Sequence, residues 1–179
     1  MPDARVILPL LIFFAMGGAT LWLLWRVVVA GGRARRDAAS GHAAAEIARR
    51  AEVLVGELLV TVDEVRRRQI RPEEAASSLA ASHDALGRHV SEATALTGGG
   101  PWAGNAAALV GDLERAQRAI ELVAHGSELL SDMAGGDWGE GETSVKRGYL
   151  NLVHAREAIH ERRETIVLSS QVRRSSLIG

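Results

Sequence analysis

Apolar residues divide the chain into one long apolar segment followed by several amphipathic ones. Residues 6–30, VILPLLIFFAMGGATLWLLWRVVVA, are apolar almost throughout, and Arg26 is their single charge. A helix of about 20 apolar residues crosses the hydrocarbon core of a bilayer, which is roughly 30 Å thick. The segment therefore predicts one transmembrane helix after a short flank, residues 1–5. A cleaved signal peptide is the alternative, but the apolar run continues well past the small-x-small site that starts at Ala15.

Positive charges predict the orientation of this helix. Arginines are in excess on its C-terminal side, whereas Arg5 on the N-terminal side is set against Asp3. Cytoplasmic flanks of membrane helices carry the positive excess. We therefore expect a single-pass protein of the cell membrane whose C-terminal domain is cytoplasmic. The arginines that carry the excess are Arg26, Arg33, Arg35 and Arg36.

Two groups of residues within the apolar segment predict contacts with lipid and with protein. Trp22, Trp25 and Arg26 lie where an interfacial belt forms at the level of the lipid headgroups. A patch of small residues has the small-xxx-small spacing that lets a second helix approach closely, although small residues are common in membrane helices generally. This patch comprises Ala15, Gly17, Gly18 and Ala19.

Helical periodicity dominates the rest of the chain. Gly31 and Gly32 open a basic stretch, residues 31–39, that is either a juxtamembrane linker or a continuation of the membrane helix. Short turns make successive helices antiparallel neighbours, so we expect a helical bundle over residues 40–172 and a flexible tail at 173–179. The predicted fold is all-α, a transmembrane helix followed by two helical hairpins. Apolar residues recur at intervals of three and four in four segments, residues 40–70, 71–96, 102–133 and 144–172.

Two details of the bundle are also predicted. His83 falls in the expected core-facing row of the second segment, which runs through Ala76, Leu79, His83, Leu86, Val90 and Thr94. A core histidine with one hydrogen-bond partner is the ordinary interpretation, and a pH-responsive switch is the alternative, because a buried imidazole loses its charge easily. Thr143 is placed to cap the fourth segment.

Composition narrows the functional classes. The net charge of −1 and an aromatic content of 4 % favour neither a basic surface nor stacking platforms, so we expect no nucleic-acid partner. The absence of cysteine excludes disulfides and thiolate metal sites. No nucleophile triad, phosphate-binding loop or dinucleotide motif is present. We therefore expect no catalytic residues, no cofactor and no identifiable small-molecule substrate.

Two arginines fall on the apolar face of the fourth segment. An antiparallel alignment places Arg156 opposite Glu121 and Arg163 opposite Glu114. A partly buried guanidinium needs such a carboxylate, because an unpaired buried charge is costly. Either the pairs are structural or the arginines lie along the edge of the row. The alternative is an anion-binding or partner-docking site between the helices.

Apolar pairs on outward faces are candidate docking residues. Val53 and Val60 lie one heptad apart on the first bundle segment, and Leu122 and Leu129 repeat this spacing on the third. Such pairs are either incidental or dock another protein chain or a second copy of this one.

A metal site is half present as a motif. Glu157 and His160 have the Glu-x-x-His spacing of di-metal carboxylate bundles, but the second copy is missing, so we predict no metal ligands. The leading hypothesis is a non-enzymatic scaffold, a non-catalytic subunit or assembly partner of a membrane complex. A membrane-anchored signalling or sensor module is the alternative, and a di-metal carboxylate enzyme is a remote one.

Overall fold

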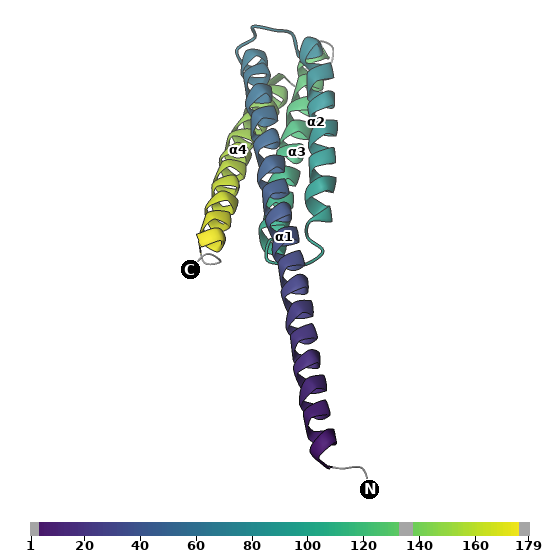
Figure 1. The fold of residues 1–179 in the computed structure, drawn as a ribbon. Helices are drawn as coiled ribbons and strands as arrows, with labels where there is room; N and C mark the ends of the chain where they lie inside the picture. The colour runs from purple at the N-terminus through teal and green to yellow at the C-terminus, as the bar shows by residue number, and fades with distance from the viewer. Residues whose placement is uncertain (1–3, 133–137, 176–179) are drawn as a thin grey trace. The chain divides into compact units, whose positions relative to one another are not determined.

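The computed structural model consists of four α-helices, and no strand occurs in the backbone it describes, residues 4–132 and 138–175. The predicted all-α fold and helical bundle are confirmed. Side chains are described for residues 21, 22, 25, 26, 37–132, 138–173 and 175. The helices are α1 (Ala4–Arg66), α2 (Pro72–Ala95), α3 (Ala103–Ser131) and α4 (Trp138–Ser175), as Figure 1 shows.

The chain divides into two compact units, residues 1–39 and residues 40–179, and α1 contributes to both. Helix α1 passes through Gly31 and Gly32 without interruption, so the basic stretch at residues 31–39 is helical. A glycine costs only about 1 kcal/mol within a helix, and a long helix tolerates such a local penalty.

Little of the predicted membrane helix, residues 6–30, has described side chains. The small-residue patch lies outside the described side chains. Within the described part of the chain, no helix reaches the length and hydropathy of a membrane span. The described residues of this segment, Leu21, Trp22, Trp25 and Arg26, are exposed, and the Arg26 guanidinium lies 5.2 Å from the centre of the Trp22 ring. The patch that is not described comprises Ala15, Gly17, Gly18 and Ala19.

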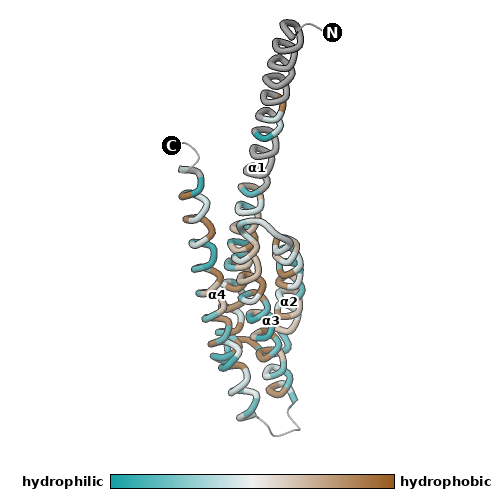
Figure 2. Tube along the Cα trace, turned by 90° about the horizontal axis from the view of Figure 1, so that it is seen from below, coloured by the Kyte–Doolittle hydropathy of each residue, from teal (hydrophilic) through white to brown (hydrophobic). Residues whose placement is uncertain are grey.

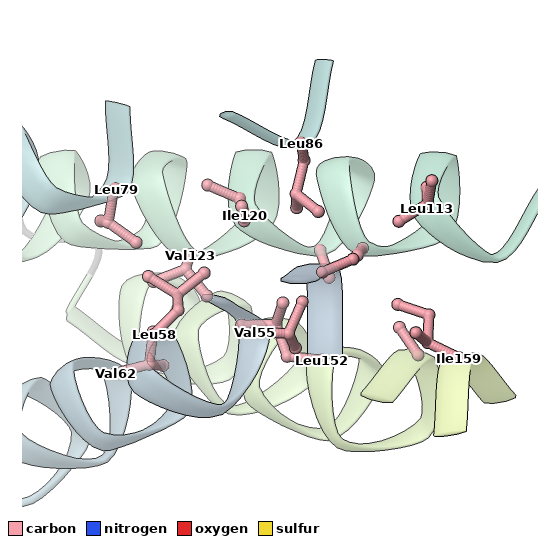
Figure 3. Packing of buried hydrophobic residues seen from close by; sticks show 14 of the residues in the cluster. Val55, Leu58, Val62, Leu79, Leu86, Leu113, Ile120, Val123, Leu152 and Ile159 are labelled. Carbon is pink, nitrogen blue, oxygen red and sulfur yellow. The ribbon is translucent and has the colours of Figure 1, made fainter. Parts of the chain in front are cut away.

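The unit formed by residues 40–179 buries one row of apolar side chains from each helix. Apolar and polar residues alternate around α2, α3 and α4 (Figure 2). The buried side chains of all four helices meet in one core, which Figure 3 shows from close by. The apolar residues that recur at intervals of three and four in α1 and α3 are largely buried. Members of this core include Val55, Leu58, Leu79, Leu86, Leu113, Ile120, Leu152 and Ile159.

The predicted core-facing row of α2 is displaced by one residue at three of its six positions. Leu79 and Leu86 are buried as predicted, but Ala75, Ser82 and Ala93 are buried in place of Ala76, His83 and Thr94. Ser82 is buried, whereas the side chain of His83 is 38 % exposed at the edge of the helix. Alanine and serine flank both sides of this row, so hydropathy alone does not distinguish the two. The interpretation of His83 as a core histidine is therefore wrong, and a switch that depends on its burial loses its basis.

Helix α4 begins at Trp138, six residues before the start that the sequence predicts. Thr143 does not cap it, because its hydroxyl donates a hydrogen bond to the carbonyl oxygen of Gly139 inside the helix, at 2.7 Å. The nearby glycines reflect close packing of helices. A Cβ added at Gly141 would lie 2.9 Å from Cγ of Leu130, and one at Gly126 would lie 2.8 Å from the Gly141 carbonyl oxygen.

Trp102 covers the end of the bundle that contains Ala44 and Ile166. The ring is buried and packs with Ala44 of α1 and Ile166 of α4. A Cβ at Gly41 would lie only 2.6 Å from the Trp102 ring, so glycine is needed for this approach. The Arg173 guanidinium lies 4.9 Å from the centre of the same ring. Helix α4 thus extends beyond residue 172, the end predicted from the sequence.

Candidate functional site

The two arginines on the predicted apolar face of α4 turn toward α1. Arg163 Nη1 lies 2.8 Å from Glu52 Oε2, and His160 Nδ1 lies 3.0 Å from Glu52 Oε1. Arg156 is exposed beside Gly56 of α1, where a Cβ on the glycine would lie 3.5 Å from the arginine Nε. The pairings with α3 predicted for both arginines are therefore corrected, because this side of α4 faces α1.

The acidic residues of α3 that were assigned to these arginines have other neighbours. Glu114 Oε2 lies 3.9 Å from Arg118 Nη1 in its own helix, and both side chains are exposed. Glu121 Oε1 lies 3.4 Å from His83 Nε2 of α2. Exposed pairs of this kind contribute about 0–1 kcal/mol to stability. No anion site between α3 and α4 forms from these four residues.

A buried ion pair that the sequence analysis missed joins α3 to α4. Asp112 is 6 % exposed, and its Oδ2 lies 3.5 Å from Arg162 Nε. Its other oxygen, Oδ1, lies 3.2 Å from Arg115 Nη1. The signal was its position, since Asp112 stands next to Leu113 and three residues after Leu109 in the core-facing row. Buried charges are retained in pairs because desolvation is costly, so the pair has a structural explanation.

His89 is the most buried of the histidines whose ion pairs the structure describes. Its side chain is 13 % exposed, and its Nδ1 lies 3.8 Å from Glu92 Oε2. Burial, and then the charges of Arg50 and Arg88, lower the pKa of His89, although Glu92 opposes them. The folded protein therefore favours the neutral imidazole.

This lowered pKa predicts a loss of stability on acidification. Below about pH 6.5, the usual pKa of histidine, the unfolded chain binds more protons than the folded one. The free energy of unfolding therefore falls as the pH drops from 6.5 through the lower folded-state pKa. We expect His89→Gln to reduce this slope in thermal denaturation of the full chain in detergent. The exposed His154→Gln is the control, and an unchanged slope in His89→Gln would refute the assignment.

Most of the predicted docking residues are exposed. Val53 and Val60 are 50 % and 61 % exposed on α1, and Leu122 is 36 % exposed on α3. Leu129 is half-buried, so the two α3 residues do not form an equally open pair. Exposed apolar residues that the sequence analysis did not single out lie on α4, among them Leu150, Val167, Leu168 and Val172.

A groove of about 830 Å³ runs between α2 and α3. Leu79 and Ile120 of the core lie beneath its floor and are each only 2 % exposed, and the alanines beside them have short side chains that leave the space open. The alanines that line the groove are Ala76, Ala80 and Ala124. The volume is typical of ligand and peptide sites.

Carboxylates surround this groove. Glu73 and Asp84 line it from α2, and three further acidic residues line it from α3. His83 is the one basic side chain among the lining residues that the structure describes, and no lysine or arginine joins it. The site therefore combines an apolar floor with a negative rim. The acidic residues from α3 are Glu121, Glu128 and Asp132.

Glu73 lies at the end of the groove where α2 begins. Its own backbone N–H, and then the nearby Ser131 hydroxyl, lower the pKa of Glu73. This carboxylate lies in the first turn of α2, where the helix dipole also favours negative charge. Glu73 therefore remains ionised at neutral pH and contributes to the negative rim.

A buried hydroxyl is the polar group of the floor. Ser127 lines the groove and is 5 % exposed, and its Oγ forms no hydrogen bond with any residue that the structure describes. A buried polar group without a hydrogen bond costs about 1–3 kcal/mol. The Oγ atom itself has almost no exposed surface, so a molecule in the groove reaches it only after the Ser127 side chain rotates.

The histidine of the Glu-x-x-His motif, His160, takes part in ion pairs with other residues. His160 contacts Glu52 and Glu164, and Arg163 lies beside it. Among the described side chains, no three histidine or acidic residues gather as metal ligands. A scan against protein-family models and searches of curated proteins and of solved structures find no match to this chain. Functional inference therefore starts from the groove.

Proposed function

We propose that this chain is a single-pass, membrane-anchored scaffold whose helical bundle binds another protein. The groove between α2 and α3 is the observation that carries the proposal. The groove has a volume of about 830 Å³, its floor is formed by apolar residues, and charged side chains surround it. Apolar surface bordered by polar residues is typical of protein interaction sites.

The N-terminal segment supports the membrane anchor. Residues 6–30 have the length and hydropathy of a bilayer-spanning helix, and arginines follow them in excess. Trp22 and Trp25 are exposed, as residues of an interfacial belt are. With this orientation the bundle is cytoplasmic, at the cell membrane. The small-residue patch offers the anchor a surface for packing against a second membrane helix.

The outward apolar residues provide a second, smaller surface. Val53 and Val60 lie one heptad apart on α1, away from the groove. Isolated exposed apolar residues are common and bind little by themselves. We therefore assign the main interaction to the groove.

The mass of the protein extracted from its native membrane with mild detergent tests this function. We expect a complex heavier than one chain, which Ala80→Trp disrupts by filling the groove. Ala81→Trp is the matched control, since Ala81 is exposed one residue further along α2 and does not line the groove. A strictly monomeric wild-type protein without a second polypeptide would contradict the proposal.

A further inference from the structure

We infer that the groove between α2 and α3 binds a basic amphipathic helix supplied by a partner protein. This inference rests on the proposed function and names the chemistry of the partner. Three features of the groove carry it, namely its charge, the spacing of its rims and its buried hydroxyl.

Charge is the first feature. Five of the 22 acidic residues of the chain line this groove, and no lysine or arginine lines it, although the net charge of the whole chain is only −1. Negative charge concentrated on one concave surface attracts cations and speeds their association. The membrane surface is not the occupant, because the cytoplasmic leaflet is itself negative.

The second feature is the geometry of the rims. Glu121 and Glu128 lie one heptad apart on α3, which places them on the same side of the helix and about 10 Å apart. Asp84 lines the opposite side, from α2. A helix that lies between these rims matches them with lysine or arginine at intervals of three, four and seven. Its apolar row then contacts the floor, as in other helix-in-groove complexes.

Short side chains on the floor determine how close such a helix comes. Ala76 and Ala80 on α2 and Ala124 on α3 leave room that larger residues would fill. A bound helix therefore buries apolar side chains of its own against these alanines, above the buried Leu79 and Ile120 of the core. Partly buried apolar anchors provide the affinity, and the acidic rims provide the selection for positive charge.

The buried hydroxyl is an independent third feature. Ser127 is more than nine-tenths buried, lines the groove and has no hydrogen-bond partner among the described residues. A small polar side chain of the bound helix supplies that partner once the Ser127 side chain rotates toward the groove. The hydroxyl lies beneath the same groove that the acidic rims border, so the groove combines an unpaired polar group with its negative charge.

A second copy of this chain is the less suitable occupant. The C-terminal part of α4 is apolar and basic, with exposed Leu168 and Val172 followed by Arg173. The Arg173 guanidinium, however, already packs over Trp102 of its own chain. The partner is therefore a different protein, and binding of a second copy is one outcome of the test.

The probe is a fluorescent synthetic peptide of 18 residues, built from leucine, alanine and lysine as an amphipathic helix. Its control carries glutamate in place of lysine. Binding to the full chain in non-ionic detergent is followed by fluorescence anisotropy at low and moderate salt. We expect saturable one-to-one binding of the lysine peptide alone, weakened at least tenfold in the triple variant Asp84→Asn, Glu121→Gln, Glu128→Gln. Ala80→Trp should abolish it.

A matched triple variant separates the groove from general attraction. Glu57→Gln, Glu140→Gln and Glu161→Gln remove the same charge from exposed positions outside the groove, and we expect affinity to stay within twofold. Equal losses in both triple variants, or binding retained in Ala80→Trp, would overturn the inference. Circular dichroism of each variant verifies that the bundle remains folded.

Two further outcomes also overturn the inference, and they leave the proposed function separately testable. Displacement of the peptide by millimolar spermine, which itself binds one-to-one, would assign the groove to small organic cations. Self-association blocked by Ala80→Trp, without peptide binding, would assign it to a second copy. If the native complex depends on Ala80 but the peptide does not bind, the proposed function stands and the basic helix is wrong. If the peptide binds but the native protein is monomeric, the proposed function fails.

Discussion

Replacing Leu152 by alanine should lower the free energy of unfolding by about 2–5 kcal/mol. Leu152 is fully buried on α4, in the core that all four helices share. Truncation removes apolar contacts and leaves a cavity that the surrounding helices fill only in part. Thermal denaturation of the full chain in detergent, followed by far-ultraviolet circular dichroism, should show a melting temperature lower by about 2–4 °C per kcal/mol.

Leu150→Ala is the matched control for this substitution. Leu150 lies two residues earlier in the same helix and is 47 % exposed. The same change of side chain should therefore alter stability by about 0.5 kcal/mol or less. Equal losses at the two positions would mean that α4 does not bury the face described above.

The substitution Gly148→Ala should destabilise the bundle by about 1–3 kcal/mol, although alanine is the better helix former. A Cβ at Gly148 would lie 2.5 Å from Cγ2 of Val123 and 2.9 Å from the carbonyl oxygen of Ala119. The second neighbour belongs to the backbone of α3, so the two helices would have to move apart. The change is measured in the same thermal denaturation experiment.

The substitution Gly111→Ala on α3 should have the opposite effect and raise the free energy of unfolding. Apart from its chain neighbours and the backbone of its own helix, no atom lies within 4 Å of a Cβ added there, so the main change is in helix propensity. We expect a gain of about 0.5–1 kcal/mol. A loss in Gly111→Ala, or a gain in Gly148→Ala, would contradict the close approach of α3 and α4.

How much of the fold follows from the sequence depends on how distinct each apolar row is. Helices α1 and α3 carry valine, leucine and isoleucine on one side, and their buried rows match the predicted ones closely. Helix α2 has small residues on both sides of its row, so the periodicity does not distinguish Ser82 from His83 as the buried position. Packing against the other helices determines the rotation of α2, and this rotation decides which of its residues are buried.

Glycine caused the error at the start of α4. A cluster of glycines indicates a loop in most sequences, yet Gly141 lies inside the helix, where α3 approaches it closely.

The ion pairs predicted for Arg156 and Arg163 were wrong for a related reason. Whether Arg163 meets Glu52 or Glu114 depends on which neighbour its side of α4 faces, and a helical wheel of one helix does not contain that information.

The groove illustrates the same limit for the functional site. Its acidic residues are visible in the sequence, but their common location depends on the rotation of α2 and on the space left by alanines. Ser127 gave no distinguishing signal, because a serine near the end of a helix is ordinary. The outward valines of α1 were predictable, since heptad spacing opposite a clear apolar row indicates exposure.

The central claim is that residues 6–30 attach this bundle to a membrane. Extraction of native membranes with alkaline carbonate tests it most directly, with the full chain followed in pellet and supernatant. We predict that the protein stays in the pellet until detergent is added. A full-length variant with Leu11→Glu and Ala19→Arg should move to the supernatant, because charges at the centre of a membrane helix oppose insertion. Release of the wild-type chain by carbonate alone would contradict the account.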